Sequence, residues 1–173
     1  MRKIFRGLLI IVLCTVMVCN AAPLSDGRVK VASHGVTDVT TAFGKTQVSV
    51  KITTHEVDIG KLSDEWPQKR LSSCTYSRVP CSLVDYVEIS VDDNVLLLAR
   101  SVYADLADVG VASLRQKKKG QFVLTLGGGD ASESYTVEVA FDKNLVRQRT
   151  LVSNEARQVM ERTIYFAPQS MNE

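Results

Sequence analysis

Histidine is scarce in this 173-residue sequence, which contains only His34 and His55. Nucleophilic serine and cysteine hydrolases need a histidine that acts on the nucleophile. His55 lies late in a strand-like pattern, where Glu56 and Asp58 alternate with it and so point to the opposite face. Nucleophile-elbow, HExxH and P-loop signatures are also missing. The remaining enzymatic alternative is a pair of carboxylates that meet in space and hydrolyse a glycoside. The sequence nevertheless favours a protein that is not an enzyme.

Long apolar runs are also missing, except for one at the N-terminus that spans Leu8 to Val18 and is broken only by Thr15. Basic residues precede this run and small residues follow it (Arg2, Lys3 and Arg6; Cys19, Ala21 and Ala22). This layout is typical of a secretory signal, and the run is too short for a comfortable membrane span. We therefore expect a cleaved signal peptide at 1–21 and a single secreted β domain at 22–173, with no transmembrane segment after signal removal.

The rival interpretation of the N-terminus is a lipoprotein that is acylated on Cys19. Val18 argues against it, since lipid-modified cysteines usually follow glycine, alanine or serine. The sequence thus predicts a periplasmic or secreted protein of bacterial type.

No excess of basic charge remains in the mature sequence. The chain has 21 basic and 19 acidic residues, and the signal removes three basic ones, which leaves 18 against 19. A near-neutral domain has no electrostatic footprint for nucleic acid, so we expect no nucleic-acid partner. The single basic run, at 115–119, ends in Gly120 between two strand patterns, which favours a solvated hairpin tip. The alternative is contact with an acidic surface, such as anionic lipid or polymer.

Four cysteines are present, and two of them (Cys14 and Cys19) fall in the signal region. The remaining pair, Cys74 and Cys81, is expected to form a disulfide in an oxidising compartment. A metal site is disfavoured because the spacing is not CxxC and both histidines lie far away in sequence. We expect neither a metal nor a cofactor.

Alternation of apolar and polar residues dominates the rest of the chain. It covers the segments 48–53, 86–91, 122–126, 135–141 and 158–166, and turn residues separate the patterns at 92–94, 117–120 and 142–144. The sequence predicts an all-β, mainly antiparallel single domain, either a β-sandwich or an open barrel of about nine short strands. At most one or two short helical turns are expected, at 101–109, where Ser101 is a candidate cap, and at 154–157.

The direction of Arg147 and Arg149 is predicted from the pairing of the two strands on either side of the turn at 142–144. If Lys143 and Asn144 form a two-residue loop, Phe141 faces Val146 and Glu138 faces Arg149. Arg147 and Arg149 would then point outward together, with Glu138 as a surface ion-pair partner that adds little stability.

The segment 60–85 shows no sustained period, and loops of this length are uncommon unless they are functional or disordered. It contains Trp66, the only tryptophan, together with Tyr76 and Arg78. Tryptophan, tyrosine and arginine are enriched at binding hot spots, so these three residues are the first candidates for partner binding. The alternative is that Trp66 packs onto the sheet as a lid.

A second candidate is the glycine-rich stretch 126–135, LGGGDASESY. A phosphate-binding glycine loop leads into a helix, whereas this stretch leads into another strand pattern. The ligand spacing of a calcium loop is missing as well. The stretch therefore favours a hairpin connection, with Asp130, Ser132 and Glu133 as secondary contact residues.

Together these features predict an exported, non-enzymatic binding protein that contacts a protein of the cell envelope through its loops. One alternative is an inhibitor or immunity protein against an envelope hydrolase such as a lysozyme. The loop motif of the membrane-bound C-type lysozyme inhibitors, a Ser-Gly-Ser-Gly-like stretch before an aromatic residue, is not matched. Another alternative is a carbohydrate- or lipid-binding envelope factor. The sequence contains no indication of the oligomeric state.

Overall fold

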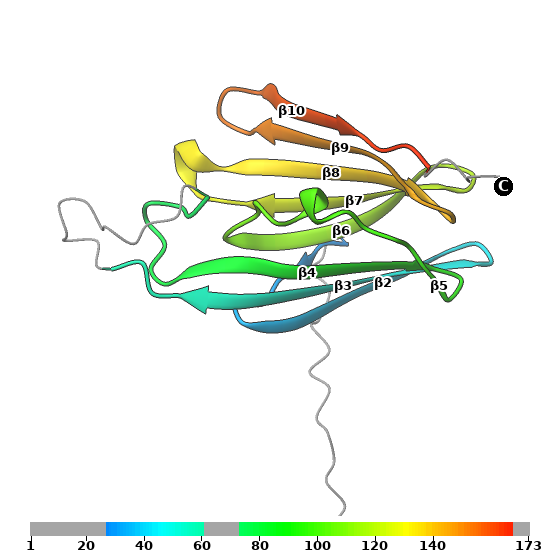
Figure 1. The fold of residues 1–173 in the computed structure, drawn as a ribbon, viewed down its shortest axis with the longest axis horizontal. Coiled ribbons are helices and arrows are strands. Elements are labelled where there is room, and N and C mark those ends of the chain that lie inside the picture. The colour runs from blue at the N-terminus through cyan, green and yellow to red at the C-terminus, as the bar shows by residue number, and fades with distance from the viewer. Residues whose placement is uncertain (1–26, 61–72, 168–173) are drawn as a thin grey trace, which may run out of the picture.

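The computed structural model describes residues 27–60 and 73–167. These form two antiparallel sheets with two short 3-10 turns and no α-helix (Figure 1). The six-stranded sheet has the order β1-β6-β7-β8-β9-β10 and the four-stranded sheet the order β2-β3-β4-β5. The predicted all-β, sandwich-like fold is confirmed, with ten strands in the described residues. The expected signal peptide and Trp66 lie outside these residues.

The elements have the following bounds: β1 (Val29–Lys30), β2 (Gly35–Phe43), β3 (Thr46–Val57), β4 (Cys81–Val91), β5 (Asn94–Val95), η1 (Arg100–Val102), β6 (Val109–Lys118), β7 (Gln121–Gly128), η2 (Ala131–Glu133), β8 (Tyr135–Asp142), β9 (Val146–Ser153) and β10 (Gln158–Ile164). No helix of the described residues is long and apolar enough to cross a membrane.

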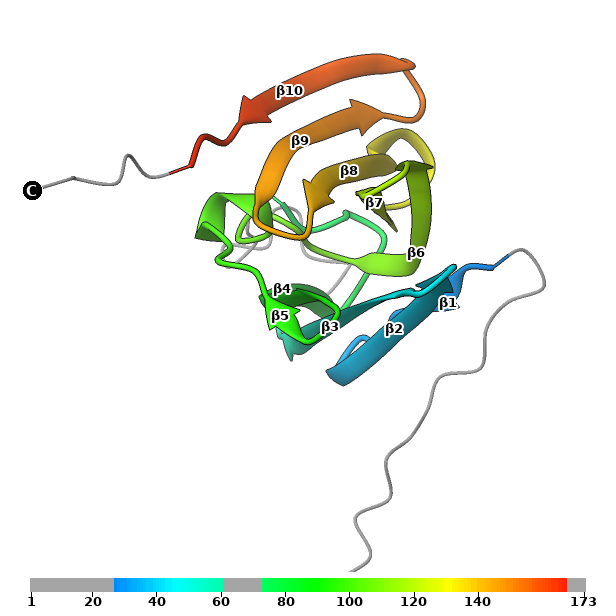
Figure 2. The same ribbon diagram turned by 90° about the vertical axis from the view of Figure 1, so that its right-hand side faces the viewer.

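The core lies between the two sheets and is built from the alternating positions of the strands. Figure 2 shows the six-stranded sheet rising from the four-stranded one, with β6 close to it and β10 furthest away. Fully buried residues come from both sheets (Val48, Val50, Ile52, Val87, Ile89, Val91, Leu124, Leu126, Val137, Val139 and Phe141). The predicted period-two patterns at 48–53, 86–91, 122–126 and 135–141 thus place most of their apolar residues in this core, whereas the pattern at 158–166 does not.

The connection from β5 to β6 crosses between the sheets and buries Leu96, Val102, Tyr103 and Leu106. Its only helical part is the 3-10 turn η1, which follows Ala99 and has no side-chain cap. The expectation that Ser101 caps a helical turn is therefore wrong, because Ser101 lies inside the turn and its hydroxyl contacts the hydroxyl of Tyr165 instead.

The predicted pairing of β8 with β9 is correct at Phe141 and Val146 and wrong beyond that point. A β-bulge makes Arg147 an extra residue, so that Arg149 lies opposite Val139 rather than Glu138. A shift of one residue moves every following side chain to the other face of the sheet. Arg149 consequently points into the protein and is 1% exposed.

The ion pairs differ accordingly from the predicted one. Glu138 pairs with Arg115 at 2.9 Å, and Arg147 pairs with Asp142 at 2.7 Å. Arg149 binds Asp105 at 2.6 Å and Glu161 at 2.9 Å. It also donates from Nε to the carbonyl of Val102. The expected surface pair is thus replaced by a buried guanidinium that joins η1, β9 and β10.

Candidate functional site

Two loops that are distant in sequence meet at one end of the sandwich, beside η2 in Figure 1. We call residues 73–80 the disulfide loop and residues 127–134 the glycine loop. The backbone N–H of Tyr76 donates to Glu133 Oε2 at 2.7 Å, and Ser77 Oγ donates to Asp130 Oδ2 at 3.2 Å. The first and second candidate regions from the sequence therefore form one continuous surface, which no sequence pattern indicated.

This surface, the loop face, comprises Tyr76, Arg78, Asp130, Ser132 and Glu133. All five residues are exposed, and 53% of Tyr76 is accessible. Val79 lies beside them in the disulfide loop and is 42% exposed. The structure thus brings together every described residue that the sequence predicted to bind a partner.

The disulfide loop is closed by the predicted bond between Cys74 and Cys81, whose Cα atoms are 5.7 Å apart. Both cysteines are buried. Cys81 is also the first residue of β4, so the predicted loop at 60–85 ends earlier than expected, and residues 81–84 pair with β3. The disulfide therefore ties the loop directly to the four-stranded sheet.

Replacing both cysteines by serine is expected to lower the free energy of unfolding by about 2–3 kcal/mol, because the bond closes a loop of about eight residues. Urea denaturation measures this loss. Wild-type protein in excess reductant is the control and should lose the same amount. An unchanged denaturation midpoint in both samples would show that the bond does not hold the loop.

Asp108 lies beneath both loops and is 2% exposed. Its carboxylate accepts the backbone N–H groups of Thr75 at 2.8 Å and Ser82 at 3.0 Å, which flank the disulfide. Its carbonyl accepts the backbone N–H of Gly129 at 3.3 Å and Arg78 Nη1 at 3.4 Å. One buried residue thus holds both loops. Sequence reasoning placed Asp108 in a turn and found no sign of this role.

The three glycines of the glycine loop are explained by packing and backbone conformation. Gly129 has a φ of +71°, and a Cβ atom there would lie 2.2 Å from the carbonyl oxygen of Glu133. A Cβ on Gly128 would lie 2.5 Å from the ring of Tyr135, and one on Gly127 would lie 2.9 Å from Val111. The predicted hairpin connection is confirmed, since β7 and β8 pair directly across this loop.

Tyr135 anchors the C-terminal end of the glycine loop. Its hydroxyl donates to the carbonyl of Ala107 at 2.6 Å. Burial raises the pKa of Tyr135, so the hydroxyl keeps its proton and remains a donor. Within the glycine loop, Asp130 Oδ1 accepts the backbone N–H of Ala131 at the start of η2.

Within residues 27–60 and 73–167, no group of three or more metal-ligating side chains is close enough to hold a metal ion.

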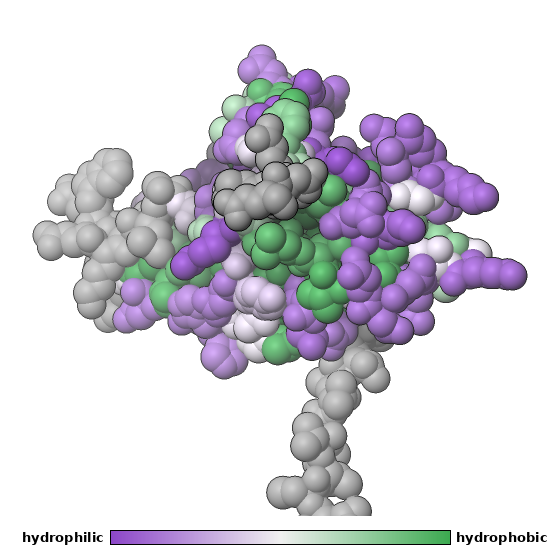
Figure 3. Space-filling model, turned by 45° about the vertical axis from the view of Figure 1, so that its right-hand side comes forward, coloured by the Kyte–Doolittle hydropathy of each residue, from purple (hydrophilic) through white to green (hydrophobic). Residues whose placement is uncertain are grey.

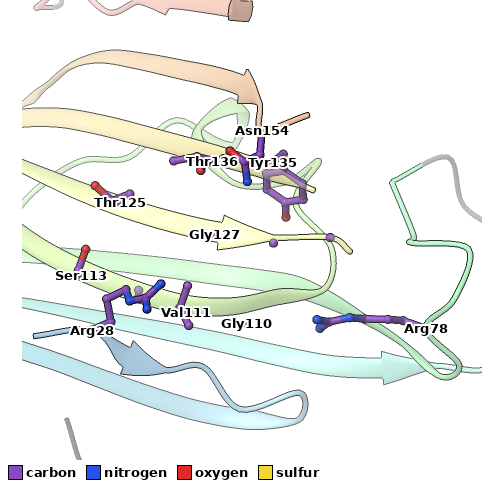
Figure 4. Close-up of a pocket in the computed structure, with 13 residues that line it drawn as sticks. Arg28, Arg78, Gly110, Val111, Ser113, Thr125, Gly127, Tyr135, Thr136 and Asn154 are labelled. Atoms are coloured by element: carbon purple, nitrogen blue, oxygen red, sulfur yellow. Dashed lines mark hydrogen bonds between the residues drawn. The ribbon is translucent and has the colours of Figure 1, made fainter. Parts of the chain in front are cut away.

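Two clefts adjoin the loop face, and Tyr135 lines both of them. The arginine cleft, of about 340 Å³, is lined by Arg28, Arg78 and small residues of β6 and β7 (Figure 4). The acidic cleft, of about 300 Å³, is lined by Asp105 and Glu133 together with apolar residues such as Met160. The charged side chains that line the two clefts are therefore of opposite sign.

An apolar groove of about 450 Å³ lies elsewhere on the molecule, beside the last described residues. It is lined by Leu97, Leu98, Leu145, Tyr165 and Phe166, and Leu97 and Phe166 are each 84% exposed. Figure 3 shows a cluster of apolar side chains on the face of the molecule that is turned to the viewer. The apolar residues Met160, Ile164 and Phe166 of the alternating segment 158–166 are all exposed, and the first two belong to β10, the edge strand of its sheet.

No protein-family model, no curated protein and no solved structure matches this chain.

Proposed function

We propose that this protein is a non-enzymatic, exported binding protein that contacts a protein partner of the cell envelope through the loop face. The observation that carries this proposal is the arrangement of Tyr76, Val79 and Arg78, which are exposed on a loop held by the disulfide, by Asp108 and by the glycine loop. The disulfide and the N-terminal signal pattern support export, because disulfides persist in oxidising compartments.

A surface of this kind suits protein recognition for two physical reasons. Tyrosine and arginine contribute more than other residues to binding energy at interfaces. A loop that is already ordered loses little conformational entropy on binding, so more of the contact energy appears as affinity. Both reasons apply to Tyr76 and Arg78.

The sharper form of the proposal is an inhibitor or immunity protein that inserts the disulfide loop into the cleft of an envelope hydrolase. The short closed loop, with Tyr76 and Val79 exposed on it, favours insertion over a flat contact. The loop face carries neither histidine. His55 lies on the four-stranded sheet instead, with 2.6 Å between its Nδ1 and Asp85 Oδ1.

Site-specific photo-crosslinking tests the proposal in the exported protein. A photoreactive phenylalanine analogue at position 76 should give one discrete cross-linked protein in the cell envelope. The matched control is the same analogue at position 86, because Tyr86 is 46% exposed on the four-stranded sheet, away from the loop face. Cross-linking to the same protein from both positions, or from position 86 alone, would contradict the proposed surface.

A further inference from the structure

The arginine cleft joins two cationic side chains from distant parts of the chain. Arg28 precedes β1, and Arg78 belongs to the disulfide loop. Figure 4 shows their guanidinium groups directed toward one another, with Val111 and Gly110 between them. The two guanidinium groups thus line the same cleft.

The floor of the cleft is formed by small and hydroxyl-bearing residues of the six-stranded sheet. Gly110 and Gly127 have no side chain to fill the space, and Ser113, Thr125 and Thr136 place hydroxyl groups along it. The Thr136 hydroxyl donates to Asn154 Oδ1 at 2.8 Å, which orders that side of the cleft. The hydroxyl groups of Ser113 and Thr125 are thus the side-chain donors that accompany the two arginines on this floor.

The charge around the cleft is of one sign. Among the described residues that line it, two are arginines and none is acidic. A wider adjoining cleft of about 910 Å³ shares Arg78 and adds Lys30, and its one acidic residue is the buried Asp108. The carboxylate of Asp108 is already hydrogen-bonded to two backbone N–H groups. Among the described residues, the two clefts thus have no exposed acidic side chain in their lining.

We propose that the arginine cleft binds a carboxylate or phosphate group of a small anionic ligand. A guanidinium group presents five N–H donors in a planar fork, which matches the two oxygens of these anions. The volume of about 340 Å³ is at the lower end of the range for small-molecule sites. This proposal goes beyond protein binding at the loop face, since a free ligand needs no protein partner.

The test is an NMR titration of the full ¹⁵N-labelled secreted protein with inorganic phosphate and, separately, with acetate. Saturable shifts are expected at the amides that line the cleft, including Gly110, Gly127 and Thr136. Arg28→Gln and Arg78→Gln should each weaken binding by about tenfold, which corresponds to the loss of one charge-assisted contact. The double variant should not bind.

Two controls separate a built site from general charge effects. Arg162→Gln removes one exposed positive charge on β10, at the other edge of the same sheet, and should leave the affinity unchanged. Sodium chloride at equal ionic strength should not produce the saturable shifts. Arg78→Lys keeps the charge without the fork, so it should bind with intermediate affinity and serves where Arg78→Gln does not fold.

A second arm identifies the source of the anionic group. Co-sedimentation with phosphatidylglycerol vesicles that the double variant loses would assign the group to a lipid headgroup, whereas phosphate or acetate binding without co-sedimentation would assign it to a soluble ligand. Shifts that persist in the double variant, or no saturable shift up to on the order of 100 mM anion, would overturn the anion site. Either result leaves the crosslinking from position 76 unaffected, so the two proposals fail separately.

Discussion

Replacing Arg149 by alanine is expected to lower the free energy of unfolding by about 3 kcal/mol, because a cavity replaces a fully buried side chain and the carbonyl of Val102 loses its donor. Asp105 and Glu161 are half exposed, so water compensates part of their loss. Urea denaturation at neutral pH measures the change. A loss below about 1 kcal/mol would show that Arg149 does not hold η1 and β10 together.

Arg149→Met is the matched control for this prediction. Methionine fills most of the volume of the arginine side chain without its charge, and apolar replacements of buried ion pairs are often tolerated. The loss of unfolding free energy should therefore be clearly smaller than for alanine. The same variant tests the electrostatics. The hydrogen bond from Thr163 is the largest cause that lowers the pKa of Glu161; burial opposes it, and the charge and hydrogen bond of Arg149 lower the pKa further. Removing Arg149 should therefore raise the pKa of Glu161 toward its usual value in an NMR pH titration.

Gly129→Ala is expected to destabilise the protein by about 3 kcal/mol. It combines a positive φ of +71° with a Cβ atom 2.2 Å from the carbonyl oxygen of Glu133. Gly120→Ala is the control, because Gly120 has a nearly identical φ of +73° and open space around its Cα, so it should cost only about 1 kcal/mol. The difference in unfolding free energy between the two variants measures the cost of the contact between the new Cβ atom at position 129 and the carbonyl oxygen of Glu133.

The same substitution affects the loop face. Moving Glu133 breaks its hydrogen bond with the backbone of Tyr76, so the disulfide loop should exchange its amide hydrogens faster in Gly129→Ala. If Gly129→Ala costs no more than Gly120→Ala, the glycines are not required by the hairpin, and a direct ligand role for this stretch becomes the better explanation.

The strands and the disulfide were predictable because their causes are local. Alternating apolar residues and turn residues determine which face of a strand is buried. Two cysteines in a chain that is expected to reach an oxidising compartment have few uses other than a disulfide. Arg149 was not predictable, because one extra residue, Arg147, reverses its direction and no feature of the sequence marks the bulge.

The candidate site was predictable in its residue types but not in its assembly. Tyr76 and Glu133 were chosen separately from their loops, and only the fold shows that they are hydrogen-bonded. Asp108 could not be recognised, since burial of a carboxylate depends on the backbone N–H groups that three-dimensional packing brings to it. Arg28 was passed over because its role depends on a cleft between distant segments.

The affinity of the cross-linked partner for purified variants tests the loop face most directly. Tyr76→Ala should raise the dissociation constant by about tenfold or more while leaving the melting temperature unchanged, as expected for an interface hot spot. Tyr86→Ala, the equally exposed control, should bind as the wild-type protein does. Equal affinity of Tyr76→Ala and wild type, or a selective loss in Tyr86→Ala, would contradict recognition through the loop face.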